Sequence, residues 1–174
     1  MGESVRMTDK AKRPWKYLDG DEVARVYENV EFPDSGSNES HCKGNLNEPR
    51  IKVDFPGYPL TSPIDWTKFP TVRLSAGMHR IAPGYGFPVH MHESGDELYL
   101  VLSGHGTIMI DEQELDAGPH DVFYMPAGCW HSGYNPEGNS DEFVLWIVRA
   151  PIPSQRVMAM GYEMTETMWR KLGL

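Results

Sequence analysis

Three histidines and one glutamate lie in two short segments whose spacing suits a metal site. His90, His92 and Glu97 fall within eight residues, and His131 follows in a second segment from Pro126 to Asn135. Three imidazoles and one carboxylate can hold a divalent transition metal and leave positions open for water or substrate. A metal held in this way acts as a Lewis acid or as a site for dioxygen. The sequence therefore predicts chemistry at a metal.

The spacing indicates how these side chains would meet. Successive side chains on a strand point to opposite faces, so His90 and His92 would project from the same face. The ESGD segment after His92 has the composition of a turn, and it would let Glu97 open the next strand facing the same interior. A turn with proline and glycine precedes the strand expected to carry His131. The four side chains would converge if these strands line one barrel.

Two stretches resemble the two signature motifs of the cupin superfamily, within roughly residues 71 to 150. The first stretch has the residues of the first motif in order and at its spacing: Gly84, His90, His92, Glu97 and Gly104. The second is similar to the pattern PxGxxHxxxN, with Pro126, Gly128, His131 and Asn135. One position departs from the family, because His120 stands where a glycine usually precedes the acidic residue, here Asp121.

The resemblance implies an all-β fold, a single jelly-roll-like barrel, with His90, His92, Glu97 and His131 as the metal ligands. The carboxylate shifts the preference of the site toward iron, manganese, nickel or cobalt, and zinc stays possible. The resemblance also implies a homodimer, with the N-terminal arm or the apolar strand from Phe143 to Val148 at the contact.

Tyr99 is the candidate catalytic residue. It lies two residues beyond Glu97 on the same face of the expected strand, so its hydroxyl could approach the metal and act as a general base. This arrangement resembles the cupin lyases that cleave dimethylsulfoniopropionate, in which a tyrosine near the metal takes a proton alpha to a carboxylate. An aromatic side chain that only fills the barrel is the alternative.

Two further residues have two interpretations each. Arg80, if it points inward, could pair with a substrate carboxylate in bidentate fashion. Cys129, expected to face inward near His131, fits a small buried apolar residue, with a redox role as the alternative.

The chain divides into three parts by composition. Residues 1–70 predict an N-terminal helix, over about residues 19–30, and a proline-rich arm packed on the barrel through Phe55, Tyr58 and Trp66. Residues 71–153 predict the barrel, with strands from Thr71, a hairpin that turns at residues 111–114, and a largely apolar strand near the end. Residues 154–174 predict a helical tail with methionines every four residues.

Composition narrows the class of protein. The chain has 174 residues, enough for one domain with its own core, and its two cysteines, Cys42 and Cys129, sit in unlike contexts that do not suggest a disulfide. A net charge of −9 argues against nucleic acid and anionic membranes as partners. The N-terminus lacks the apolar centre of a secretory signal, and no apolar run has membrane-spanning length, so we expect a cytoplasmic protein.

Three functions remain open from the sequence. The first is a metal-dependent enzyme, a dioxygenase or a lyase or isomerase, that acts on a small oxygen-rich or carboxylate-bearing molecule. The second is a barrel that binds or senses a small molecule without turnover. The third is a structural subunit.

Overall fold

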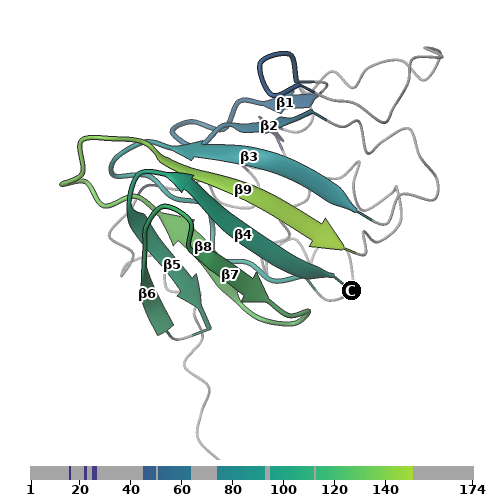
Figure 1. Ribbon diagram of the computed structural model, residues 1–174, viewed down its shortest axis with the longest axis vertical. Helices are drawn as coiled ribbons and strands as arrows, with labels where there is room; N and C mark the ends of the chain where they lie inside the picture. The colour runs from purple at the N-terminus through teal and green to yellow at the C-terminus, as the bar shows by residue number, and fades with distance from the viewer. Residues whose placement is uncertain are drawn as a thin grey trace, which may run out of the picture.

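The computed structural model is mostly β, with two antiparallel sheets (Figure 1). It describes Lys16, Glu22, Arg25, Val26 and residues 45–49, 51–63, 74–92, 95–111 and 113–150. The strands within these ranges are β1 (Ile51–Val53), β2 (Leu60–Ser62), β3 (Ser75–Ile81), β4 (Asp96–Ser103), β5 (Gly106–Ile110), β6 (Gln113–Ala117), β7 (Val122–Met125), β8 (His131–Tyr134) and β9 (Phe143–Ala150). No helix in the described part of the chain is long and apolar enough to cross a membrane.

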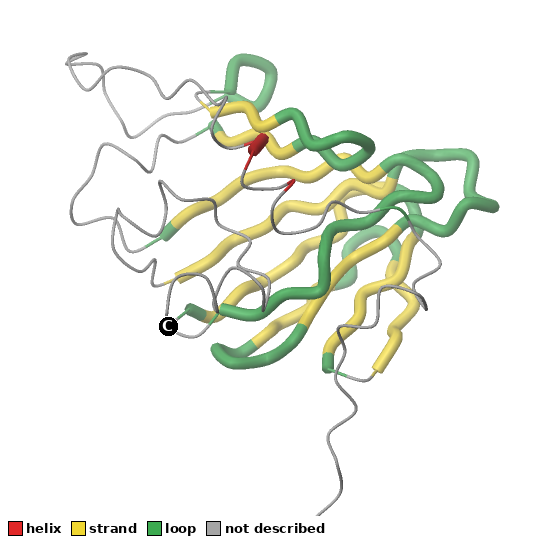
Figure 2. Tube along the Cα trace, turned by 180° about the vertical axis from the view of Figure 1, so that it is seen from behind, coloured by secondary structure: helices red, strands yellow, loops and turns green. Residues whose placement is uncertain are grey.

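The two sheets form the jelly-roll-like barrel that the sequence predicts. The larger sheet has the strand order β1-β2-β3-β9-β4-β7, and the smaller has the order β6-β5-β8. Strand β9 pairs with both β3 and β4, so the last described strand lies between them inside the larger sheet. Figure 1 shows β9 in yellow-green between these two strands, and Figure 2 shows the same layers from behind, with the connecting loops in green.

Alternation along β4 sets which side chains enter the interior of the barrel. Glu97, Tyr99 and Val101 are buried, whereas Leu98 and Leu100 between them are only half-buried. This is the period-two pattern of a strand with one face turned to a core. The alternation predicted for this strand is confirmed.

Cross-strand register carries the same face onto the neighbouring strands. Directly opposite residues in an antiparallel pair project to the same side of the sheet. Opposite Glu97 lies Arg149 on β9, and opposite Val101 lies Leu145, which in turn pairs with His79 on β3. The inner face of the larger sheet therefore carries polar side chains at one end and apolar side chains beyond them.

The barrel core joins residues from both sheets. Fully buried side chains in one cluster include Phe87, Tyr99, Ile108, Phe143 and Leu145. Gly133 on β8 is needed for this packing, because a Cβ there would lie 2.8 Å from the ring of Phe87. This apolar core lies between the two sheets, next to the polar side chains at one end of the inner face.

The arm before the barrel is more regular than expected. Instead of an extended proline-rich segment, residues 51–62 contain β1 and β2, which pair with each other and extend the larger sheet beyond β3. Phe55 and Tyr58 are buried and stack with ring centroids 5.1 Å apart, as expected of anchors. Glu22, Arg25 and Val26 are helical. The rest of the predicted N-terminal helix, Trp66, Cys42 and the predicted C-terminal helix lie outside the described residues.

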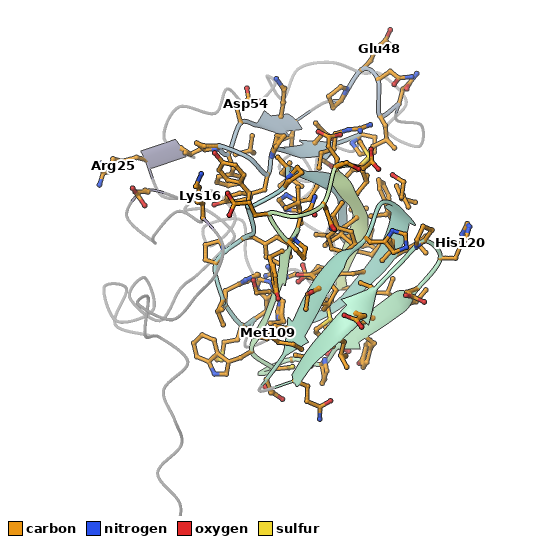
Figure 3. The ribbon with its side chains drawn as sticks, turned by 90° about the vertical axis from the view of Figure 1, so that its left-hand side faces the viewer. Lys16, Arg25, Glu48, Asp54, Met109 and His120 are labelled. Atoms are coloured by element: carbon orange, nitrogen blue, oxygen red, sulfur yellow. The ribbon has the colours of Figure 1, made fainter. Side chains whose placement is uncertain are left out.

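The departure from the family pattern at His120 falls in a tight turn. Pro119 and His120 are the central residues of a turn closed by the Asp121 N–H, which donates to the Gly118 carbonyl at 3.1 Å. His120 has a φ of 74°, a left-handed conformation that glycine adopts most readily. Its side chain is exposed and projects from the tip of this turn (Figure 3). The substitution therefore affects a surface turn, away from the ligand residues.

Candidate metal centre

The four side chains predicted as metal ligands meet inside the barrel. One ligand atom from each of His90, His92, Glu97 and His131 lies within 4.8 Å of the others, and all four residues are buried. The two sheets contribute Glu97 from β4 and His131 from β8, and the segment before β4 contributes the other two histidines. The arrangement could hold one metal ion.

His90 and His92 reach this position by a different backbone than expected. They lie outside the named strands, in an extended segment where His90 forms an isolated antiparallel bridge with His131. The His90 N–H donates to the His131 carbonyl at 3.0 Å, and the His131 N–H donates back at 2.8 Å. Met91 is half-buried between two buried histidines, so the predicted alternation still holds. Backbone hydrogen bonds thus join the two ligand-bearing segments directly at the ligand residues.

Backbone carbonyls orient two of the imidazoles. The Nδ1–H of His90 donates to the Pro88 carbonyl at 2.8 Å, and the Nδ1–H of His131 donates to the Cys129 carbonyl at 2.9 Å. Hydrogen bonds of this kind fix the tautomer of a metal-ligating histidine and leave the Nε2 lone pair for the metal. The two rings therefore present unprotonated nitrogens to the centre.

The contact between His131 and Glu97 shows that the centre requires a positive charge. Nε2 of His131 lies 2.8 Å from Oε2 of Glu97, and Nε2 of His92 lies 3.4 Å from the same oxygen. A nitrogen lone pair that faces a carboxylate oxygen at this distance is repulsive unless a proton or a metal ion lies between them. Ligand atoms about 2.1 Å from one ion and at right angles would be about 3 Å apart. The 2.8 Å distance between His131 Nε2 and Glu97 Oε2 therefore fits two ligand atoms on a single ion.

Burial and charge hold these groups in the forms that bind metals. Burial lowers the pKa of His92 to about 4 and lowers the pKa of His90 well below its usual range. Burial alone would raise the pKa of Glu97, but its electrostatic coupling to His92 and His131 outweighs burial and lowers the pKa well below its usual range. Neutral imidazole and ionised carboxylate are the ligand forms that metals require.

Tyr99 touches the centre through Glu97. Its hydroxyl donates to Oε2 of Glu97 at 3.0 Å, and the side chain is 1% exposed. The ring packs edge-on against Phe87, with centroids 5.8 Å apart. The structure thus brings the predicted catalytic residue into contact with a predicted ligand.

The arginine inside the barrel is not Arg80, the residue considered from the sequence. Arg80 points outward and forms an ion pair with Glu142 at 3.1 Å, with both side chains about half exposed. The buried arginine is Arg149 on β9, with Nη1 3.4 Å from Nε2 of His92. Its position follows from the pairing of Arg149 with Glu97, which local sequence does not show.

His79 is a second interior residue that sequence reasoning missed. It is 4% exposed, stacks on Phe87 and has Nδ1 3.0 Å from the Tyr58 carbonyl. Burial lowers its pKa to about 4. We therefore describe His79 as a neutral core residue.

Cys129 is buried, as expected, but lies outside the group of ligand residues. Its thiol contacts the Trp130 carbonyl at 3.6 Å. Burial and the nearby Asp111 carboxylate raise the pKa of the thiol to about 11. A thiol with such a pKa is a poor nucleophile, which favours the packing role.

Comparisons with known proteins agree with this geometry. The family model described as Cupin domain matches residues 77–148. An auxin-binding protein of Nicotiana tabacum is 29% identical over an alignment of length 104, which covers 54% of this chain and 54% of that protein. A provisionally named quercetin 2,3-dioxygenase of Pasteurella multocida is 31% identical over an alignment of length 88, which covers 48% of this chain and 36% of that protein. The chain thus spans about half the length of the auxin-binding protein and about a third of the length of the dioxygenase.

The fold is also found among solved structures. An RmlC-like cupin from Shewanella frigidimarina has a TM-score of 0.55 and 17% identity, covering 67% of this chain and 96% of that one. A likeness at this identity concerns the fold alone. The family match covers the four ligand residues, all of β4 to β8 and most of β3 and β9, so this part of the chain is a cupin domain.

Proposed function

We propose that this protein is a metal-dependent enzyme that acts on a small oxygen-rich or carboxylate-bearing molecule bound inside the barrel. The observation that carries the proposal is the buried group of three imidazoles and one carboxylate, with ligand atoms within 4.8 Å of one another. A divalent ion in this position supplies Lewis-acid chemistry or a site for dioxygen. Iron, manganese, nickel and cobalt suit this donor set, and zinc is compatible with it.

The residues around the centre have separate tasks in this proposal. His90, His92, Glu97 and His131 are the ligands, and the Pro88 and Cys129 carbonyls keep two of the rings in the metal-binding tautomer. Tyr99 handles a substrate proton, since its hydroxyl lies at the centre and hydrogen-bonds a ligand oxygen. Burial of the group excludes bulk water and strengthens each of these interactions.

The type of reaction divides into two classes. Similarity to the provisionally named dioxygenase of Pasteurella multocida supports an oxidative reaction. The proximity of a tyrosine hydroxyl to the ligand carboxylate supports a proton-transfer reaction, such as that of a lyase or isomerase. A substrate found by screening oxygen-rich acids would separate them, because only a dioxygenase stops working without oxygen and consumes oxygen in proportion to product.

Elemental analysis of the purified protein is the first test of the proposal. We expect about one divalent transition metal per chain, and loss of that metal in His90→Ala and His131→Ala variants that remain folded. If wild-type protein bound none of iron, manganese, nickel, cobalt and zinc, the proposal of a metal-dependent enzyme would be contradicted.

A binding protein without turnover is the second candidate. The 29% identity to an auxin-binding protein over about half of both chains supports this reading. Calorimetry with an auxin and with candidate acids would identify a ligand. A ligand bound tightly and recovered unchanged after incubation with the metal-loaded, aerated protein would favour binding or sensing.

We also propose that the protein forms a homodimer, as the family resemblance implies. Val122 and Tyr124 on β7 and Leu102 on β4 are large apolar side chains, each more than 40% exposed. Sedimentation velocity over a range of protein concentrations would measure the oligomeric state directly.

A further inference from the structure

A buried arginine lies at the edge of the candidate metal centre. Arg149 is 3% exposed and lies on the inner face of β9, directly opposite Glu97. Its Nη1 lies 3.4 Å from Nε2 of His92, an atom that faces the centre. The guanidinium group therefore lies inside the barrel beside the atoms that would hold the metal.

The charge of Arg149 has a consequence for what binds beside it. A guanidinium keeps its proton at all physiological pH values, so this charge is fixed. A fixed positive charge repels a divalent cation a few ångströms away, and the repulsion is strongest where water is excluded. An anion in contact with both groups is attracted by each of them. The position of Arg149 thus disfavours a metal alone and favours a metal together with an anion.

We propose that Arg149 binds the negatively charged end of the ligand and selects carboxylate or similar oxyanions over neutral molecules. This inference rests on the proposed metal-dependent function, because the metal and Arg149 would contact the same ligand. The planar fork of the guanidinium matches a carboxylate in bidentate geometry. Arg149 therefore takes the carboxylate-binding role that was expected of Arg80.

The contact with His92 indicates how Arg149 becomes available. An N–H of Arg149 reaches the Nε2 lone pair of His92 as long as that lone pair is not used by a metal. If His92 used this lone pair to hold a metal, the same N–H would lose its acceptor on His92 and could donate to a ligand oxygen instead. Anion binding through Arg149 should therefore follow metal loading.

Cobalt-loaded protein offers a test that does not need the natural substrate. The visible spectrum of bound cobalt reports both metal uptake and a change of its ligands. Oxalate, a chelating dianion, is titrated against wild type, Arg149→Met and Arg80→Met, and imidazole serves as the neutral metal ligand. Arg80→Met is the matched control, because it removes an arginine from the outer face of the barrel.

We expect Arg149→Met to bind cobalt at least as tightly as wild type, because a repelling charge is removed, and to bind imidazole like wild type. The same variant should bind oxalate about 10- to 100-fold more weakly, as the loss of a hydrogen-bonded charge partner implies. Arg80→Met should match wild type for both ligands. If Arg149→Met does not fold, Arg149→Gln replaces it.

The outcomes separate this inference from the proposed function. Oxalate affinity that is unchanged in a cobalt-loaded Arg149 variant overturns the role of Arg149 and leaves the metal site intact. Equal weakening of oxalate and imidazole also overturns it, because the residue would then act on the metal site as a whole. Failure of wild-type protein to take up cobalt or any other ion contradicts the proposed function, and the anion site with it.

Discussion

Nε2 of His131 lies 2.8 Å from Oε2 of Glu97, with both side chains buried. Because Nδ1–H of His131 is committed to the Cys129 carbonyl, the contact holds only with a shared proton or a metal ion between the two atoms. The folded protein therefore pays a cost when the centre lacks a cation, and the unfolded chain does not. This difference links metal binding to stability.

Metal loading is expected to raise the melting temperature. An ion that binds only the folded state stabilises it by about 2.7 kcal/mol at 100 times its dissociation constant. For a chain of this size that corresponds to a rise of about 5–10 °C. Differential scanning calorimetry of chelator-treated protein, before and after addition of manganese, cobalt or zinc, measures the change.

The variant His131→Gln is the control for this prediction. It removes the Nε2 ligand and retains a polar side chain, so its melting temperature should not respond to metal. Equal melting temperatures of treated and loaded wild-type protein would contradict a metal site at these residues.

The role of Tyr99 is tested by Tyr99→Phe. If the hydroxyl handles the substrate proton, turnover falls by about 10²- to 10⁴-fold while the metal content and metal affinity stay unchanged. If the hydroxyl only holds Glu97, metal affinity falls by about tenfold or more, because partners of ligand residues tune affinity in this range. Parallel measurements of metal affinity and initial rate distinguish the two roles.

Tyr124→Phe is the matched variant for this experiment. Tyr124 also donates to a carboxylate on β4, Asp96, at 2.7 Å, but its side chain is 57% exposed on the outer side of the barrel. Its loss should change neither metal affinity nor rate. Full activity of Tyr99→Phe would remove Tyr99 from the catalytic machinery.

The sequence predicted those features that depend on local periodicity. His90 and His92 are two residues apart, Glu97 and Tyr99 are two residues apart, and each pair shares a face, as the alternation of extended backbone requires. The turn between β5 and β6 likewise lies within the predicted range, after Ile110. Short-range spacing of this kind survives in the folded protein because a residue's neighbours determine it.

Features that depend on pairing between distant strands could not be predicted in the same way. The mostly apolar run of β9 shows no alternation, so the inward direction of Arg149 depends on its register with Glu97. On β3, Ala76 and Met78 share a face with Arg80 and are buried, whereas His79 on the opposite face points into the barrel core. The apolar residues therefore indicated the wrong face of β3 as the inner one, and with it an inward Arg80. Strands β1 and β2 are three residues long and lie among prolines, which conceals their periodicity.

The stability of the protein should depend on His79 in mild acid. Burial lowers the pKa of His79 from 6.5 to about 4, so between these pH values the unfolded state binds a proton that the folded state does not. The free energy of unfolding therefore falls as the pH falls from 6.5 toward 4, by about 3 kcal/mol from this residue. Urea unfolding at several pH values in this window measures the slope.

The variant His79→Gln isolates this contribution from that of other acidic and basic groups. Glutamine cannot take up the proton, so the pH dependence of its unfolding free energy should be weaker than that of wild type. His105→Gln, at an exposed position, should keep the wild-type slope. Identical slopes for wild type and His79→Gln would show that His79 accepts a proton in the folded state without cost.

Two left-handed turn positions should respond to substitution in opposite directions. His120 has a φ of 74°, and this conformation costs a non-glycine residue about 1–2 kcal/mol. Glycine removes that strain but gives the unfolded chain more entropy, so His120→Gly should raise the free energy of unfolding by a net of about 0.5–1 kcal/mol. Gly128 has a φ of 84°, and no atom lies within 4 Å of a Cβ built there, so Gly128→Ala should lower stability by about 1–2 kcal/mol through the backbone alone. Urea midpoints at constant m-value measure both changes.

Because the Gly128 N–H donates to the His92 carbonyl at 2.8 Å, Gly128→Ala should also weaken metal binding, whereas His120→Gly should leave metal binding unchanged. A stabilising alanine at position 128 would show that this turn relaxes to another conformation without disturbing the ligand segment.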